Sequence, residues 1–456
     1  MRAGRRTDMN CEFEVVIWPP LRLARMRCER GSVIVVLPAA PFCTDQGGRH
    51  AHHWHGYSPS CCRSGIAAGR SASPYGADPH GPGQPLEAFA RKELTHDDHV
   101  IVEATGNAAA VAEVLAPHVD RVVIANPKQV RMIAHAKIKT DAIDTAVLAK
   151  LYSTGFLPEV WVPDERTLAL RRQVARRTQL VRQRVRLKNL IQSILHSHLI
   201  PPCPHGNLVG ISGRKWIAAQ IVPADERAAI ERHLAQIDLI ESSLKVIEGE
   251  IAHEAMADPI IRRLMTLPGV DMVVASGVAA AIGDIRRFAD PTKLASYLGL
   301  NPSVRQSGEG PAYHGRITKQ GRGQARGMLV EAAWAVARSP GPLRAFFQRI
   351  ASRRGKHIAA VATARKLAMI IWHMLTKGTD YIWMRPALLA RKFRSIELRA
   401  GLPTSHAKRG SAYDYNIPEK RAEERGRVEA AEQEYANFAS RWRAKPRIRK
   451  VQVQPT

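Results

Sequence analysis

The chain has 456 residues, of which 45% are apolar, enough to give about three folding units a core each and to exclude a wholly disordered chain. Lys and Arg outnumber Asp and Glu by 68 to 41, and the resulting net charge of +27 predicts a polyanionic partner. No uninterrupted apolar run reaches the roughly 18 residues of a membrane span, and the N-terminus lacks a signal-peptide pattern. We therefore expect a cytoplasmic protein with no membrane partner.

Residues 1–84 differ in composition from the rest of the chain. Five of the six cysteines lie within the first 62 residues, and several His accompany Gly, Ser and Pro over residues 47–83. A Cys/His metal site is one interpretation, but the adjacent Cys61 and Cys62 lack the paired spacing of a zinc tetrahedron. We favour an atypical leader that is disordered or translated out of frame, with order beginning near Leu86.

A βαβ unit is predicted next. The run HVIVEA at 99–104 is rich in β-branched residues and predicts a buried strand that ends in the carboxylate of Glu103. A helix through about His118 and a strand at 121–125 complete a parallel pair. Functional crevices of such sheets lie at the carboxyl ends of the strands, which makes Glu103 a candidate site residue. The alternative is an incidental solvent-facing glutamate at a strand edge.

Two aspartates open the following predicted helix. In KIKTDAIDTAVLAKL, Thr140 resembles an N-cap, and Asp141 and Asp144 are three residues apart and can face one point. Compensation of the helix dipole would also place acids in a first turn. The basic residues around the pair favour a site, because divalent cations can bridge carboxylates to a bound phosphate.

A long basic helix follows. Residues 166–188 contain nine Arg or Lys, and no Asp or Glu occurs from there until Asp225. Apolar residues at helical spacing leave a cationic polar side, which favours contact with a nucleic-acid backbone over a solvated face of mixed charge. The candidate phosphate-binding residues are Arg171, Arg172, Arg176, Arg177, Arg182, Arg184 and Lys188. A second helix from Asp225 has a coiled-coil seam that pairs with the first helix or with another subunit.

The region after residue 260 carries two further motifs. The turn at Leu267–Val270, between two predicted helices, resembles a helix-hairpin-helix, in which backbone N–H groups such as that of Gly269 receive a DNA phosphate. A polar, Gly-rich loop follows, where Ser307 beside Gly308 is a candidate nucleophile, although spacing alone favours an ordinary loop serine. The cations of this loop that are candidates to bind phosphate are Arg305, Arg316, Lys319 and Arg322.

The succession of these motifs resembles the DEDD-type insertion-sequence transposases of the IS110 group, which are bridge-RNA-guided serine recombinases. The resemblance runs from about Leu86 to about Tyr381. It is carried by VEATG, KTDAID, LPGV, IGDIRRFADPTKLASYLGLNP and RQSG followed by ITKQG. It implies an α/β plus mostly α chain. The expected parts are a RuvC-like, RNase H-type domain at 85–160, the long basic helix and coiled coil at 161–257, a helical transposase domain with a helix-hairpin-helix element and the serine loop at 258–384, and a mixed-charge tail at 385–456.

The resemblance also implies a chemistry. Glu103, Asp141 and Asp144 would bind Mg²⁺, and Ser307 would form a covalent serine–DNA intermediate. The implied partners are double-stranded DNA, a structured noncoding guide RNA and further copies of the chain in a tetramer whose sites are shared between subunits.

One departure from the family pattern leaves other functions open. The family's first aspartate, on an opening strand before the glutamate, has no evident counterpart, since Asp45 and Asp78 lie in turn-like sequence. One alternative is therefore a transposase remnant that only binds nucleic acid. The other is a Holliday-junction resolvase-like nuclease, in which water replaces the serine.

Overall fold

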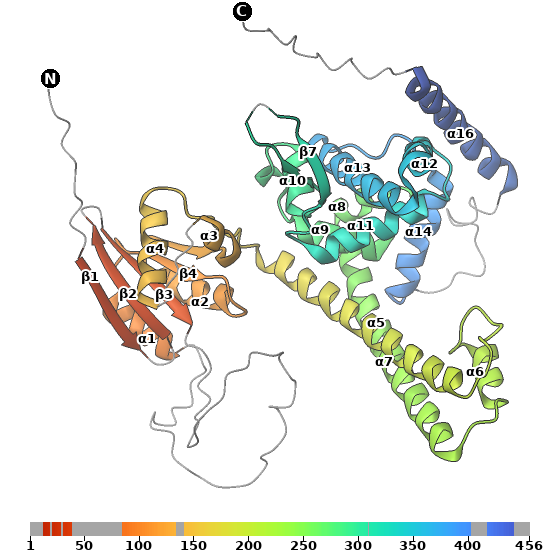
Figure 1. Ribbon diagram of the computed structural model, residues 1–456, viewed down its shortest axis with the longest axis horizontal. Coiled ribbons are helices and arrows are strands. Elements are labelled where there is room, and N and C mark those ends of the chain that lie inside the picture. The colour runs from red at the N-terminus through yellow and green to blue at the C-terminus, as the bar shows by residue number, and fades with distance from the viewer. Residues whose placement is uncertain are drawn as a thin grey trace, which may run out of the picture. The chain divides into compact units, whose positions relative to one another are not determined.

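The computed structural model describes residues 12–18, 21–28, 31–38, 84–133, 141–308, 310–402 and 417–441. Within these ranges side chains are described from Leu86 onward, except those of Asp141, Ala142 and His314. The chain divides after Val162 into two compact units (Figure 1). The first contains a sheet and the second is almost entirely helical.

A five-stranded sheet forms the centre of the first unit. Its strands, in spatial order, are β1 (Glu12–Trp18), β2 (Leu21–Cys28), β3 (Gly31–Pro38), β4 (His99–Glu103) and β5 (Arg121–Ala125). The first three strands form an antiparallel meander, and β3, β4 and β5 are parallel. The register places Val36 beside Val102 and Glu103 beside Ala125. The predicted strands at 99–104 and 121–125 are therefore confirmed, together with their parallel pairing.

The prediction that order begins near Leu86 is wrong. Three strands lie within residues 12–38, and β3 extends the sheet beside β4. Periodicity reports only local pattern, so it could not show that the apolar stretch near Ser32 pairs with a strand far along the chain. Residues 47–83, including the candidate Cys/His ligands, lie outside the described residues, as do Asp45 and Thr140.

Helices cover both faces of the sheet in the first unit. They are α1 (Gln84–Glu93), α2 (Ala108–Leu115), α3 (Pro127–Ile133) and α4 (Asp141–Ser153), with a 3₁₀ turn, η2, at Ala116–His118. Successive side chains of β4 point to opposite faces: Val100 and Val102 pack with α1 and α2, and Ile101 packs with α4. A strand buried on both faces reads as an unbroken apolar run, which explains the HVIV pattern.

Two long helices begin the second unit, and Figure 1 shows them side by side. Helix α5 (Glu165–Ser197) packs against α7 (Ala224–Ala257), with the short α6 (Ile211–Ala218) between them in sequence. The buried residues of α7 recur every seven positions, at Ile230, Ile237, Leu244 and Ile251. This spacing is that of a coiled-coil seam. The partner of the seam, which the sequence left open, is α5 of the same chain.

The remaining helices enclose the largest apolar core of the second unit, which includes Leu264, Val278, Leu329 and Leu367. They are α8 (Pro259–Leu264), α9 (Met272–Ile282), α10 (Pro291–Tyr297), α11 (Gly323–Val336), α12 (Pro342–Arg354), α13 (Lys356–Lys377), α14 (Pro386–Arg399) and α16 (Pro418–Arg441), with a 3₁₀ turn, η3, at Ile285–Arg287. Strands β6 (Pro302–Arg305) and β7 (Tyr313–Ile317) form an antiparallel hairpin that connects α10 to α11. Helix α9 is buried almost all round, as its small apolar residues require.

Helix α13 is the one helix in the described part of the chain that is long and apolar enough to cross a membrane. Its Leu367, Ala368 and Ile371 are buried in the same core as α9 and α11. Burial in a protein core therefore accounts for its composition.

Candidate functional site

The predicted carboxylates of the first unit lie on two neighbouring elements. Glu103 is the last residue of β4 and is half-buried. Within the described part of the chain its carboxylate has no ion-pair partner. Asp141 is the first residue of α4, and its side chain lies outside the described set, whereas Asp144 is half-buried and makes an interaction within the chain.

The far end of α4 is fixed against the start of β4. The Tyr152 hydroxyl lies 2.8 Å from Nδ1 of His99, and the two rings meet edge to face. Further along, Leu148 packs in one cluster with Ile101. Helix α4 packs over β3 and β2, and its Tyr152 and Leu148 side chains reach His99 and Ile101 of β4.

The lengths of the two elements are compatible with both acids at the same edge of the sheet. From Tyr152 back to Asp144 the helix rises about 12 Å, at roughly 1.5 Å per residue. From His99 to Glu103 the strand rises about 13 Å, at roughly 3.3 Å per residue. These lengths, with the contact of Tyr152 and His99, are compatible with a position of Asp144 level with Glu103.

These residues offer oxygen ligands only, which suits magnesium. Among the described side chains no group of three His, Cys, Asp or Glu is close enough to hold a metal ion, and Asp141 is outside that set. The next strand contributes no carboxylate, because β3 has the sequence GSVIVVLP. Val36 pairs with Val102, so the position beside Glu103 belongs to Leu37. The donor set of the described strands is thus short of the four carboxylates that the family resemblance implies.

A polar network at the opposite edge of the sheet was missed by the sequence analysis. Besides its contact with Tyr152, His99 places Nε2 at 2.9 Å from Asp120 Oδ2. The neutral imidazole can accept at one nitrogen and donate at the other, so both contacts suit a single tautomer. The three residues are far apart in sequence, and only a lone His at a strand start hinted at them. Their role is to hold α4 in register with β4.

Some of the arginine side chains of the basic helix α5 face α7. Arg177 forms an ion pair with Glu248 at 2.7 Å, and Arg184 lies 3.7 Å from Glu241. Arg172 pairs with Glu165 at the start of its own helix. Arg177 and Arg184 therefore do not belong to a cationic side that is free to face a nucleic acid, whereas Arg172 remains exposed. The acidic partners on α7 follow a long stretch without Asp or Glu, so a reading of α5 alone could not reveal them.

The other cations of α5 fall into two groups. Arg176 and Arg182 are exposed and lie on the side of α5 away from α7. Lys188 is half-buried beside Asn207, and burial together with the charge of Arg184 lowers its pKa. Arg171 is half-buried and donates hydrogen bonds to backbone carbonyls at the end of α9. Arg176 and Arg182 are therefore the best placed of the seven to meet a phosphate backbone.

The predicted turn between α8 and α9 is present, and its tip packs inward. Gly269 has φ +76°, and a Cβ there would lie 2.5 Å from the carbonyl oxygen of Ala332 on α11. The turn needs glycine both for this backbone conformation and for the close approach. Leu267 and Val270 are fully buried. Gly269 therefore has a packing role in this fold.

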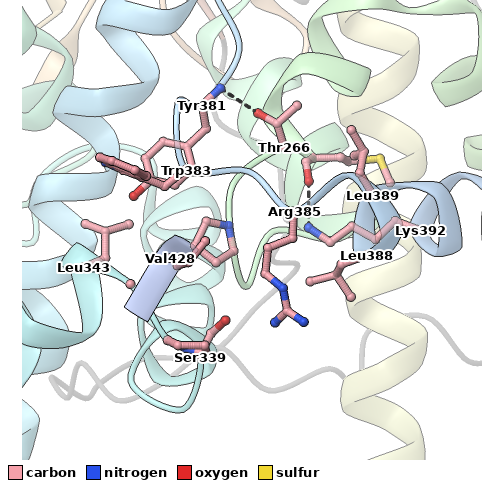
Figure 2. Close-up of a pocket in the computed structure, with 14 residues that line it drawn as sticks. Thr266, Ser339, Leu343, Tyr381, Trp383, Arg385, Leu388, Leu389, Lys392 and Val428 are labelled. Carbon is pink, nitrogen blue, oxygen red and sulfur yellow. Dashed lines mark hydrogen bonds between the residues drawn. The ribbon is translucent and has the colours of Figure 1, made fainter. Parts of the chain in front are cut away.

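One lysine binds the inside of this turn, as Figure 2 shows. Lys392 of α14 donates from Nζ to the carbonyl oxygens of Met265 at 2.6 Å, Leu267 at 2.8 Å and Val270 at 2.8 Å. Burial lowers the pKa of Lys392 to about 8. Beside it, the Thr266 hydroxyl accepts a hydrogen bond from the backbone N–H of Tyr381. The ammonium thus satisfies three carbonyls of the turn.

Ser307 lies at the exposed tip of the β6–β7 hairpin. Gly308 follows with φ +54° and open space around it, and the Ser307 carbonyl accepts a hydrogen bond from the N–H of Gly310. Arg305 and Arg316 are exposed on the two strands. The serine hydroxyl is therefore open to a large ligand and has cations nearby in sequence. Ser307 belongs to the second unit of the chain, and Glu103 and Asp144 belong to the first.

The last two cations of the loop, Lys319 and Arg322, make contacts that anchor the C-terminal end of the loop. Lys319 has a positive φ of 56°, and its carbonyl accepts a hydrogen bond from Arg326 at 3.1 Å. The Arg322 Nε donates to the hydroxyl of Tyr297 at 2.8 Å. Both side chains are exposed, so these anchoring contacts leave them accessible.

Two segments of the chain match transposase family models. Residues 81–200 match a transposase family model of the IS110 DEDD type, and residues 261–348 match the Transposase IS116/IS110/IS902 family. The first match contains Glu103, Asp141 and Asp144, and the second contains Gly269 and Ser307.

Individual relatives carry the same description. A putative transposase of Sinorhizobium fredii is 30% identical over 53% of this chain and 57% of its own length. A probable family 20 transposase of Pseudomonas aeruginosa is 27% identical over 53% of this chain and 74% of its own. The transposase for insertion sequence element IS1111A of Coxiella burnetii is 33% identical over 29% and 38%. The chain thus aligns with only part of each relative.

Proposed function

We propose that the chain is an insertion-sequence transposase that cuts and rejoins DNA to move its element, since residues 261–348 match the Transposase IS116/IS110/IS902 family and residues 81–200 match a transposase model of the IS110 DEDD type. The observation that carries the proposal is the presence in one chain of two parts. One is a sheet edge with Glu103 and Asp144, and the other is an exposed, glycine-flanked Ser307 on a basic hairpin. Phosphoryl transfer needs an oxygen nucleophile and groups that neutralise the phosphate charge, and these parts supply both.

In the proposed reaction Ser307 Oγ attacks a backbone phosphorus of DNA. An ester bond to the serine forms while the bond to the leaving sugar oxygen breaks, and the serine proton passes to that leaving oxygen or to solvent. The exposed Arg305 and Arg316 neutralise developing charge. A second DNA hydroxyl then attacks the ester and releases the serine. Because one phosphate ester replaces another at each step, rejoining requires no ATP.

The carboxylates have a separate role in this proposal. Glu103, Asp141 and Asp144 bind Mg²⁺, which when bound supplies a Lewis acid for the phosphate oxygens. Because the carboxylates and the serine belong to different units, we propose that a working site takes them from different copies in a homo-oligomer, a tetramer by the family resemblance. Arg176 and Arg182 bind nucleic-acid backbone. The partners are double-stranded DNA and a structured guide RNA, which fits a chain with only 6% aromatic residues for base stacking.

A second candidate function is supported by one observation. Leu37 stands beside Glu103, so the strand next to β4 contributes no acidic ligand. Loss of one carboxylate weakens metal binding, and a chain in this state would bind nucleic acid without cutting it.

Excision of the element from a donor plasmid in the presence of its RNA tests the proposal. We expect Mg²⁺-dependent excision by the unmodified chain and its loss, by 100-fold or more on the scale of about 10²–10⁴ typical for a missing catalytic group, in Glu103→Gln and in Ser307→Ala. The matched controls are the exposed Glu113→Gln and Ser296→Ala, which should retain full excision. DNA binding without any excision would favour the non-cutting remnant. Activity that survives in Ser307→Ala would favour the resolvase.

A further inference from the structure

Three arginines from separate elements surround one phenol at the base of the serine hairpin. Tyr297 ends α10, and its hydroxyl accepts the hydrogen bond from Arg322 Nε at 2.8 Å. The guanidinium carbon of Arg287, on η3, lies 4.3 Å from the centre of the Tyr297 ring. Arg171 of α5 also acts electrostatically on Tyr297, Arg287 and Arg322. A cluster built from four separate segments is a feature of the fold, not of one helix face.

Two of the arginines also donate hydrogen bonds to carbonyl groups at the C-terminal end of α9, but these hydrogen bonds do not neutralise the guanidinium charges. Arg171 donates from Nε to the Ala280 carbonyl at 2.6 Å, and Arg287 donates from Nε to the Ile282 carbonyl at 2.9 Å. The C-terminus of a helix carries the equivalent of roughly half a negative charge. Three guanidinium groups carry three positive charges. The Asp284 carboxylate also acts on Arg287 while it pairs with Arg286, so the α9 C-terminus and this one carboxylate oppose only part of the three charges.

The ionisation behaviour of the cluster reflects this surplus. Burial, and then the charges of Arg322 and Arg287, lower the pKa of Arg171. Burial raises the pKa of Tyr297, but the hydrogen bond and charge of Arg322 and the charge of Arg287 outweigh it, so the pKa falls below its ordinary value. The groups that lower these two pKa values are guanidinium groups. A positive potential at the phenol explains the lowered pKa of Tyr297, and it adds to the effect of burial on Arg171.

The hydrogen-bond inventory points to an anionic acceptor. A guanidinium has five N–H donors and no acceptor. Since the Tyr297 oxygen accepts from Arg322, its own hydrogen is directed elsewhere. Arg322 is exposed and the other three side chains are half-buried, so a ligand can reach them. Phosphate oxygens match this arrangement, because arginine binds them through paired hydrogen bonds.

We infer that Arg171, Arg287, Arg322 and Tyr297 form a binding site for a backbone phosphate of nucleic acid. The backbone N–H of Arg322 donates to the Tyr297 carbonyl at 3.1 Å, so the site closes the base of the hairpin that carries Ser307. The strand from Pro302 to Ser307 spans about 17 Å, at roughly 3.3 Å per residue. The phosphate held here is therefore not the one that Ser307 of the same chain attacks. Only this last step rests on the proposed function.

The salt dependence of DNA binding tests the inference. The binding constant for a DNA duplex is measured between 50 and 200 mM KCl without Mg²⁺, in a Ser307→Ala background. Each lost phosphate contact should lower the slope of log K against log salt by about 0.9. We expect this change in Arg322→Gln, and weaker binding at every salt concentration in Tyr297→Phe. The control is Arg286→Gln, since Arg286 is 87% exposed and pairs with Asp284.

Each outcome decides the inference. A slope that stays at the unmodified value in Arg322→Gln, or unchanged affinity in Tyr297→Phe, would overturn it, whatever happens to thermal stability. Arg322→Lys keeps the charge, so it should retain the slope and serves if Arg322→Gln does not fold. The assay involves no cleavage, so a chain that never excises its element could still show the slope change. In that case the proposed function would fall and the phosphate site would stand.

Discussion

Replacing Lys392 with Met removes the one ammonium that holds the turn between α8 and α9. The side chain keeps its apolar stem, and the carbonyls of Met265, Leu267 and Val270 lose their shared donor. The Leu267 carbonyl still accepts a hydrogen bond from the N–H of Val270, so two carbonyls are left without a partner. A buried carbonyl without a partner costs about 1–3 kcal/mol, so two cost at least about 2 kcal/mol. Release of the buried charge offsets part of this. We expect the free energy of unfolding to fall by about 2 kcal/mol at pH 7.

The same substitution should also change how the free energy of unfolding depends on pH. Burial lowers the pKa of Lys392 to about 8, from 10.5 in the unfolded chain. Between these values the unfolded chain binds the extra proton, so the free energy of unfolding rises with pH, by at most about 1.4 kcal/mol per unit. Met cannot contribute this rise. The difference in stability between the unmodified chain and Lys392→Met should therefore widen above pH 8.

Urea unfolding of the full chain, followed by tryptophan fluorescence at pH 7 and pH 9.5, measures both effects. Trp383 lines the pocket beside Lys392 and reports on this region. The control is Lys366→Met on the exposed side of α13, which should stay within about 0.5 kcal/mol of the unmodified chain. If Lys392→Met matches this control at both pH values, the ammonium does not hold the turn and the reasoning is refuted.

Four further substitutions test separate parts of the fold. Gly269→Ala should lower the melting temperature, with a loss of about 2 kcal/mol or more, because φ is positive and the new Cβ would meet a backbone oxygen; unchanged melting would contradict the packing role. Arg177→Ala should cost about 1 kcal/mol of stability with an unchanged salt slope of DNA binding, whereas Arg182→Ala should lower that slope by about 0.9 at unchanged stability, and the reverse pattern would refute the division of α5. Tyr152→Phe, which loses the bond to His99, should destabilise the first unit by about 1 kcal/mol and raise the Mg²⁺ concentration needed for half-maximal excision; a shift in neither would count against the anchoring of α4.

Local patterns in the sequence were sufficient to predict several elements. The run that ends at Glu103 is a buried strand, the seam of α7 is a coiled coil, and the turn at Leu267–Val270 joins two helices. In each case the information lies within a few residues, as a β-branched run, a seven-residue repeat or a Pro-Gly turn.

Partners that lie far apart in the chain were beyond the reach of such patterns. Strand β3 pairs in parallel with β4, which follows only after a long intervening segment of the chain. The local sequence predicts that Arg184 is a solvated cation, whereas in the fold Glu241 of α7 lies beside it. The contact of Tyr297 with Arg322 joins two ends of a hairpin, and Arg171 joins them from another helix. Charge alone predicted nucleic-acid binding, but only the fold separates structural arginines from available ones.

In the proposed reaction a serine hydroxyl becomes linked to DNA during strand exchange. Denaturing the reaction of the unmodified chain with its RNA, labelled donor DNA and Mg²⁺, followed by protease digestion and mass spectrometry, measures this directly. The account predicts a DNA-linked peptide with the bond at Ser307, absent in Ser307→Ala and without Mg²⁺. Nicked DNA that carries no peptide, or a linkage at another residue, would contradict it.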